Sequence, residues 1–232
     1  MTPFGRQPVT AGLLATQALA EAPAPDQAPD KWALLRDLTT ARASFGVSDR
    51  DLAVLSALLS FHRGKELADD EALIVFPSNA ALSERAHGMA ESTLRRHLAA
   101  LVRAGLILRR DSPNGKRYAR KGEGGEIDQA FGFDLSPLYC RSEEVARAAE
   151  AVREAEERVR RLREVVSLMR RDIAALADFG EEIQPGFGFW DQLRDTAALT
   201  ARALRRNLSF DDLAACRGDL EALLDQARNL ID

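Results

Sequence analysis

Cysteine, histidine and aromatic residues are scarce in this chain. Its 232 residues include two cysteines, Cys140 and Cys216, and three histidines. Two cysteines cannot form the disulfide framework of a small secreted protein, and they cannot supply a four-ligand zinc site without histidine. We therefore expect a reducing compartment. Aromatic residues make up only 6% of the chain, while arginine and alanine recur throughout, which favours helices over a β-sandwich.

Long hydrophobic runs are also missing. No apolar stretch reaches the roughly 18 residues that a membrane-spanning helix needs. Arg6 lies near the N-terminus, but no compact apolar segment follows it as in a secretory signal. We expect no membrane partner, and we predict a cytoplasmic protein.

A strong overall charge is absent, yet one segment is strongly basic. The formal net charge of the chain is −4. Residues 78–121 contain ten basic and three acidic side chains, a net +7, so the rest of the chain carries −11. A basic segment in an acidic protein indicates a polyanionic partner such as double-stranded DNA.

Residues 1–30 lack the pattern of a folded domain. Pro23, Pro25 and Pro29 deny helical hydrogen bonds, and little apolar surface is present to offset the entropy of ordering. We predict a disordered or partly helical tail here, with a short helix around residues 13–19. A first folded domain is expected over residues 31–140.

The predicted domain begins with helices. Trp32, Leu35 and Leu38 have helical spacing. Ser48 and Asp51 form a capping-box-like pair before a run of leucines on one face. The next predicted elements are a short strand at residues 72–76, a helix at 80–86 capped by Ser78 or Asn79, a turn at 87–89, and a helix at 91–104 that Gly105 ends.

Two strand-like runs follow, at residues 106–110 and 116–120, on either side of Asn114-Gly115. This dipeptide is typical of a tight turn between paired strands, so we predict a β-hairpin, with a further strand at residues 130–135. Helices, a tight turn, a helix and a basic hairpin are, in this order, the elements of a winged helix-turn-helix. The predicted fold class is therefore mainly α with a small β-hairpin wing.

The helix over residues 91–104 has two different faces. At 100° per residue, its leucines cluster on one side and its polar side chains lie on the other. The first turns of such a helix present side chains to base edges in the major groove, and hairpin arginines contact phosphates or an adjacent minor groove. The alternative for any one charged face is simple solvation. The predicted base-reading residues are Ser92, Thr93 and Arg96, flanked by Arg95 and His97, and the other predicted DNA-binding residues are Arg103, Arg109, Arg110, Lys116, Arg117 and Arg120.

From Ser142 the pattern changes to a heptad repeat. One apolar series recurs every seven residues, and a second series follows three residues after each member of the first. The first series is Val145, Val152, Val159, Val166 and Ile173, and the second is Ala148, Ala155, Leu162, Met169 and Leu176. This repeat predicts a long coiled-coil-like helix over residues 142–178, ended by Gly180 and Pro185-Gly186.

A helical segment is predicted beyond it, over residues 188–232. Its two amphipathic helices lie at about 190–206 and, capped by Ser209 with Asp212, at 210–230. The apolar seam of the long helix can pair with a second copy, and the resulting homodimer would raise the effective concentration of DNA-binding surfaces. Alternatively, the seam packs against the two later helices of its own chain. We favour the dimer from the sequence alone.

Four stretches of the sequence are long and distinctive. They are FGVSDRDLAVL at residues 45–55, FPSNAALSERAHGM at 76–89, STLRRHL at 92–98 and RRDSPNGKRY at 109–118, and TPFGR at residues 2–6 joins them. Together they resemble RepC, the replication initiator of repABC-type bacterial plasmids. The resemblance covers residues 1 to about 180, the N-terminal and central region of that family.

The resemblance implies a winged-helix protein that binds double-stranded origin DNA and starts plasmid replication. In that family the origin lies within the coding region of the initiator itself. Host replication proteins are expected as further partners. Members of the family are usually longer, and we expect the additional C-terminal domain that they carry to be absent from this chain.

Two other function classes share some of these features. A winged helix followed by a coiled coil is also typical of dimeric transcriptional regulators, which need the same basic surface. Some plasmid initiators nick DNA with a tyrosine and a metal held by a His-x-His pair, but His62, His87 and His97 do not have this spacing. No phosphate-binding Gly-x-x-x-x-Gly-Lys-Ser/Thr motif is present. We predict no enzymatic activity, no cofactor and no metal.

Overall fold

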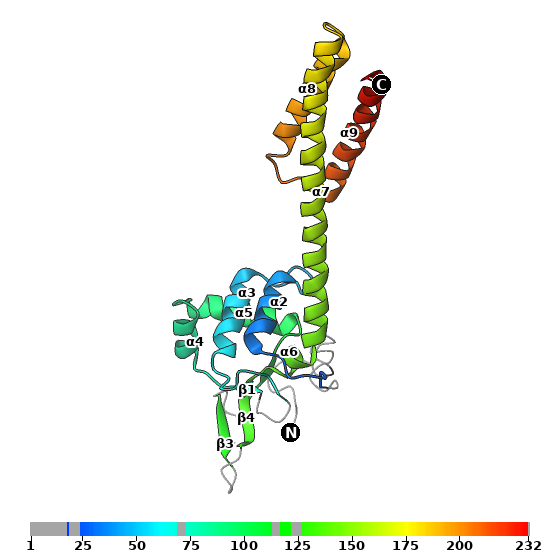
Figure 1. The fold of residues 1–232 in the computed structure, drawn as a ribbon. Coiled ribbons are helices and arrows are strands. Elements are labelled where there is room, and N and C mark those ends of the chain that lie inside the picture. The colour runs from blue at the N-terminus through cyan, green and yellow to red at the C-terminus, as the bar shows by residue number, and fades with distance from the viewer. Residues whose placement is uncertain (1–17, 19–23, 69–72, 113–116, 122–126, 232) are drawn as a thin grey trace. The chain divides into compact units, whose positions relative to one another are not determined.

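A computed structural model of the chain describes residues 18, 24–68, 73–112, 117–121 and 127–231. It is mainly helical with a small antiparallel sheet (Figure 1), as the composition predicts. Contacts within the chain define two units, residues 1–152 and 153–232. Most of the predicted tail, residues 1–30, lies outside the described residues. None of the described helices is long and apolar enough to cross a membrane.

Three of the helices described in the first unit begin at a side chain that accepts hydrogen bonds from free backbone N–H groups. The Asp30 carboxylate accepts hydrogen bonds from the N–H groups of Trp32 and Ala33. Ser48 and Asp51 form the predicted capping box, and such a cap is worth about 1 kcal/mol. The described helices are α2 (Lys31–Thr40), α3 (Asp49–Leu59), α4 (Asn79–Arg85), α5 (Glu91–Arg103), α6 (Ser136–Cys140) and the first part of α7 (Ser142–Ile183).

Gly105 ends α5 as predicted. Its φ of +65° lies in the left-handed region, where glycine carries no steric penalty. The Gly105 N–H donates to the Val102 carbonyl (3.0 Å) and the Leu106 N–H donates to the Leu101 carbonyl (3.1 Å). These two bonds satisfy carbonyls of the last helical turn and direct the chain into the sheet.

The sheet is built around β4 (Ile127–Asp134). The other described strands, β1 (Ile74–Val75), β2 (Leu108–Arg110) and β3 (Tyr118–Lys121), each pair with it in the antiparallel direction. Phe133 of β4 lies opposite Val75 on one side and Arg109 on the other. β1 passes so close to Gly132 that a Cβ there would overlap the Val75 carbonyl oxygen, so this position requires glycine.

The prediction of a hairpin between residues 106–110 and 116–120 is wrong in its pairing. β2 and β3 both run antiparallel to β4, along successive parts of it, and do not pair with each other. The observed hairpin consists of β3 and β4. Phe131 and Phe133 of β4 are buried, and burial of a strand face outweighs a local turn signal in choosing its partner. Asn114-Gly115 itself lies outside the described residues.

The core of the first unit combines both kinds of element. Leu55 of α3, Leu94 and Leu101 of α5, and Phe133 of β4 are almost fully buried in it. Burying a side chain of this kind contributes about 1.5–3 kcal/mol. The first turns of α7 also belong to this core, because Val145 and Ala149 are fully buried there. The core therefore extends beyond residue 140, where we predicted the domain to end.

The second unit consists of the later part of α7 with α8 (Gly188–Ala203) and α9 (Phe210–Ile231). Side chains from all three helices form one core. Its buried members include Leu162, Val166 and Ile173 of α7, Trp190 and Leu193 of α8, and Leu213, Leu220 and Leu224 of α9. The later heptad positions thus pack inside their own chain, as the second of the two alternatives predicts. Homodimerisation stays a prediction.

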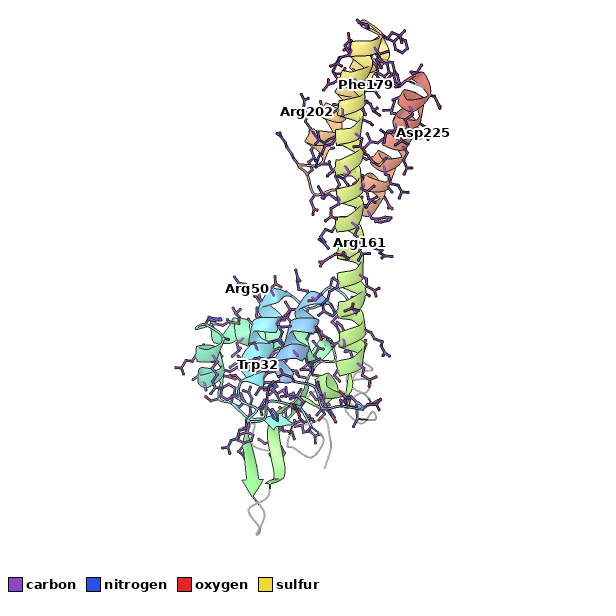
Figure 2. All side chains as sticks on the ribbon, viewed as in Figure 1. Trp32, Arg50, Arg161, Phe179, Arg202 and Asp225 are labelled. Atoms are coloured by element: carbon purple, nitrogen blue, oxygen red, sulfur yellow. The ribbon has the colours of Figure 1, made fainter. Side chains whose placement is uncertain are left out.

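α7 continues past the residue predicted to end it. The sequence predicts an end at Gly180, but the helix extends to Ile183. Gly180 lies within the helix, and its lack of a side chain leaves room for Trp190. A Cβ there would lie 2.5 Å from the indole ring. Next to it, Phe179 is 49% exposed (Figure 2). Close packing, and not chain reversal, explains this glycine.

Candidate nucleic-acid interface

A tight turn joins α4 to α5 at the predicted residues. His87 and Gly88 have φ values of +59° and +71°, and this left-handed conformation is uncommon for a non-glycine residue. The Gly88 N–H donates to the Ser83 carbonyl (2.8 Å), and the Ser83 hydroxyl donates to the Met89 carbonyl (2.7 Å). These bonds fix the direction in which α5 leaves α4.

α5 has one buried and one exposed face, as its sequence predicts. Leu94, Leu98 and Leu101 are buried against the rest of the first unit. Of the predicted site residues on this helix, Thr93 is half-buried, and the exposed ones are Ser92, Arg95, Arg96 and Arg103. α3 packs against both α4 and α5, so it holds these two helices together on the side away from the exposed face of α5.

His97 does not belong to the exposed face. Only 7% of it is exposed, and its Nδ1 lies 2.7 Å from Oδ1 of Asp51. On a helical projection it lies about 140° from Ser92, next to the leucine sector. Because this side chain is used inside the core, we remove His97 from the predicted base contacts.

The partner of His97 also caps α3. Asp51 accepts hydrogen bonds from the Ser48 N–H and hydroxyl through Oδ2, at 2.7 and 2.6 Å. Burial raises the pKa of Asp51, but the bonds from Ser48 and His97 outweigh burial, so that the pKa lies below its usual value. One buried carboxylate thereby connects the start of α3 to the middle of α5.

A second carboxylate lies at the start of α5. Glu91 is the first residue of the helix, and its Oε1 accepts hydrogen bonds from Asn79 Nδ2 (2.5 Å) and Arg95 Nη2 (2.6 Å). The bonds from Asn79 and Arg95 lower the pKa of Glu91. Glu91 thus connects the first residue of α4 to the second turn of α5.

The two arginines of β2 are exposed but differ in their partners. Arg109 Nε lies 2.6 Å from Asp111 Oδ1 at the surface. Arg110 approaches Oδ2 of Asp134 through Nε (2.7 Å) and Nη2 (2.6 Å). Asp134 is fully buried, so Arg110 compensates a charge that would otherwise destabilise the sheet.

Arg117 is half-buried at the base of the sheet. Its guanidinium lies 4.4 Å from the centre of the Phe133 ring and donates a hydrogen bond to the Pro77 carbonyl (2.9 Å). Burial lowers the pKa of Arg117, and the positive charges of Arg109 and Arg95 lower it further. Side chains from α5, β2 and the chain before β3 therefore form a single basic surface.

A hollow of about 420 Å³ opens on this surface. Its lining includes Ser78 and Asn79 at the start of α4 together with Arg109, Arg110 and Arg117. Of the remaining predicted residues, Arg120 lies on β3 opposite Gln129, and Lys116 lies outside the described residues. The structure thus brings α4, α5 and the strand arginines to one place.

The side chains that organise this surface, Glu91, Asp51 and Asp134, are not among the site residues predicted from the sequence. Glu91 and Arg95 are four residues apart, which is the spacing of a helical ion pair, so this one contact could have been predicted from the sequence. Nothing local indicates that Asp51 bonds His97, or that Asp134 bonds Arg110, because these partners are far apart in sequence.

The histidines occupy separate places. His62 Nε2 lies 3.0 Å from the Glu66 carbonyl oxygen, His87 lies in the turn, and His97 contacts Asp51. In the part of the chain that the structure describes, no group of three or more His, Cys, Asp or Glu side chains could hold a metal ion.

Comparisons of the sequence with a family model and with individual proteins point to the same family. The family model of the replication protein C N-terminal domain matches residues 7–181. A replication protein C of Sinorhizobium fredii (strain NBRC 101917 / NGR234) is 45% identical over 232 residues, which are 100% of this chain and 57% of that protein. One of Rhizobium rhizogenes is 42% identical over 231 residues, with the same coverage of 100% and 57%. No solved structure matches the chain.

The chain thus spans 57% of the length of these two relatives. The family model covers both the basic surface and most of α7. The chain therefore belongs to the replication protein C family.

Proposed function

We propose that this chain binds the double-stranded DNA of a plasmid replication origin, as the DNA-binding part of a replication initiator. The proposal rests on one observation: the exposed face of α5 and the arginines beside the sheet form one basic surface, in which the charges of Arg109 and Arg95 both act on Arg117. Membership of the replication protein C family supports the role in plasmid replication.

In this proposal α4, the turn and α5 act as a helix-turn-helix. α5 enters the major groove, which is wide enough for a helix, and its first turns contact base edges. Ser92, Thr93 and Arg96 supply these contacts, because Ser92 and Arg96 are exposed there and Thr93 is half-buried. An arginine on the two acceptors of a guanine contributes about 1–3 kcal/mol of discrimination.

β2, β3 and β4 act as the wing. Arg109, Lys116 and Arg120 contact phosphates or an adjacent minor groove and supply the salt-dependent part of the affinity. Arg110 and Arg117 have structural partners as well, in Asp134 and Phe133. Their charges act on DNA from fixed positions.

The test uses the gene that encodes this chain as its own source of candidate sites. The family resemblance implies that the origin lies within this coding region. Short duplexes that tile the gene are titrated with the protein at several salt concentrations, next to a shuffled duplex of equal composition. We expect one region to bind at least 1,000-fold more tightly than the shuffled duplex, as specific sites generally do. Equal binding to every duplex would contradict the proposal.

A transcriptional regulator needs the same surface, so DNA binding alone does not separate the two functions. Replication of an origin-bearing plasmid supplied with this protein in trans does. We expect replication to depend on the basic surface and on host replication proteins. Repression of a promoter without replication would favour the regulator.

A further inference from the structure

Glu91 is an acidic side chain within a basic surface, next to Arg95 and near Arg117. It occupies the first position of α5, the end from which helices of this kind contact bases. Arg95 and Asn79 bond it directly, and the charge of Arg117 also acts on it. A carboxylate here repels DNA phosphates, so its charge by itself opposes binding to DNA of any sequence.

The two oxygens of this carboxylate have different surroundings. Oε1 accepts both hydrogen bonds, from Asn79 and from Arg95. Among the described residues, Oε2 accepts none. The Glu91 side chain is 53% exposed, so one oxygen is held in place and the other is available to a ligand.

Supports on two helices hold this side chain. Asn79 reaches it from the start of α4, and Arg95 reaches it from the next turn of α5. Holding the carboxylate before binding removes part of the entropy cost of ordering it at the interface. These bonds also lower its pKa, so the carboxylate is ionised and acts only as a hydrogen-bond acceptor.

We propose that Glu91 determines sequence specificity by accepting a hydrogen bond, through Oε2, from the exposed amino group of a cytosine in the major groove. This inference rests on the proposed function. Cytosine N4 is the major-groove donor that carboxylates recognise. Guanine and thymine present no donor in the major groove, so there the carboxylate gains no hydrogen bond and still repels the backbone; adenine offers a donor at N6 but places the N7 acceptor beside it, which a carboxylate disfavours. One residue can therefore favour cytosine and disfavour the other bases.

The test selects binding sites from a random duplex library with three proteins: wild type, Glu91→Gln and Glu84→Gln. Glutamine keeps an oxygen for Asn79 and Arg95 but loses the charge. Glu84 is an exposed residue of α4, so its substitution is the matched control for charge. We expect wild type and Glu84→Gln to select the same sites, with cytosine at one fixed position.

With Glu91→Gln we expect the cytosine preference to fall roughly tenfold at that position and to persist elsewhere in the site. A second variant, Asn79→Ala, keeps the carboxylate but removes one support, and we expect a smaller loss at the same position. Circular dichroism confirms that each variant is folded.

Two results would overturn the inference in different ways. If Glu91→Gln selects the wild-type sites unchanged and binds all duplexes more tightly, Glu91 acts only through its charge, while the proposed function stands. If wild type selects no sequence, the proposed function fails and the inference fails with it.

Discussion

Single side chains on α5 divide into those that face outward and those that hold the helix. Arg96 is exposed and makes no hydrogen bond or ion pair with the described residues. His97, the next residue, is buried against Asp51. Two adjacent residues of one helix therefore have different roles: in the proposed function Arg96 contacts DNA, whereas His97 stabilises the fold. We expect substitutions at exposed positions to change DNA binding and substitutions in the buried contact to change the free energy of unfolding.

Arg96→Ala tests recognition. We expect affinity for the specific duplex to fall by about 1–3 kcal/mol and affinity for random DNA to change little, because a base contact is lost. Fluorescence anisotropy with both duplexes measures this, and Arg36→Ala on α2, also exposed, is the control. An equal loss on both duplexes would show that Arg96 contacts a phosphate.

Asp51→Asn tests the buried connection between α3 and α5. The folded pKa of Asp51 is lowered, so its ionised form stabilises the fold above the unfolded pKa near 4, and this contribution disappears as the pH falls through the folded value. We expect the variant to lose about 1.5–3 kcal/mol at pH 7. Urea unfolding from pH 7 to pH 2 should show the difference from wild type shrinking below about pH 4.

Asp49→Asn is the control for this measurement. Asp49 lies in the same helical turn, but its side chain is 77% exposed beside Arg42, and exposed ion pairs contribute little. A difference between wild type and Asp51→Asn that does not vary with pH would contradict a role for the charge of Asp51.

At the level of elements, local sequence signals predicted most ends of helices but not which strands pair with each other. The Ser48–Asp51 box, the turn at His87-Gly88 and the end of α5 at Gly105 are all encoded within a few residues. The pairing of β2 with β4 depends on burial of Phe131 and Phe133 far along the chain. Short-range patterns carry no information on such choices.

The structure shows which strand arginines can be replaced to test DNA binding without disturbing the fold. Replacing Arg110 would leave the buried Asp134 uncompensated, so a loss of binding there would mix folding with contact. Arg109→Gln with Lys116→Gln avoids this problem. We expect weaker binding on all sequences and a slope of log K against log salt that is flatter by about 0.9 for each lost phosphate contact. An unchanged slope would place these residues outside the interface.

Gly180 and Gly218 both lie within helices, but we expect alanine substitution at the two positions to change stability in opposite directions. Alanine at Gly180 forces the Trp190 indole to move, and overpacking of this kind costs about 1–3 kcal/mol. A Cβ at Gly218 of α9 meets nothing within 4 Å, so alanine there should stabilise by about 0.5–1 kcal/mol. Urea unfolding followed by tryptophan fluorescence measures both, and destabilisation by both variants would contradict the packing argument.

For the molecule as a whole, the heptad repeat of α7 does not reveal which helices cover its apolar face. Val145 lies in the first core, while Leu162, Val166 and Ile173 lie in the second. Between them Val152 and Ala155 are half-buried. A regular repeat shows that one helical face is apolar, but whether a second chain or the same chain covers it depends on helices elsewhere in the sequence.

Truncation tests how the first unit is completed. A chain ending at residue 152 retains Val145 and Ala149, and we expect it to fold cooperatively and to bind DNA. A chain ending at residue 140 loses both side chains, which are fully buried, and we expect it to be less stable by roughly 2–4 kcal/mol. Thermal unfolding compares the two, and equal stability would show that α7 contributes nothing to this core.

The inclusion of Val145 and Ala149 in the first core also sets an order of events during synthesis. The core cannot close until residue 149 has been added to the chain, and by then every residue of the proposed DNA-binding surface has been made. The remaining 83 of the 232 residues take roughly 4–17 s to add at about 5–20 residues per second. A nascent chain can therefore complete its first unit while α8 and α9 are still being translated.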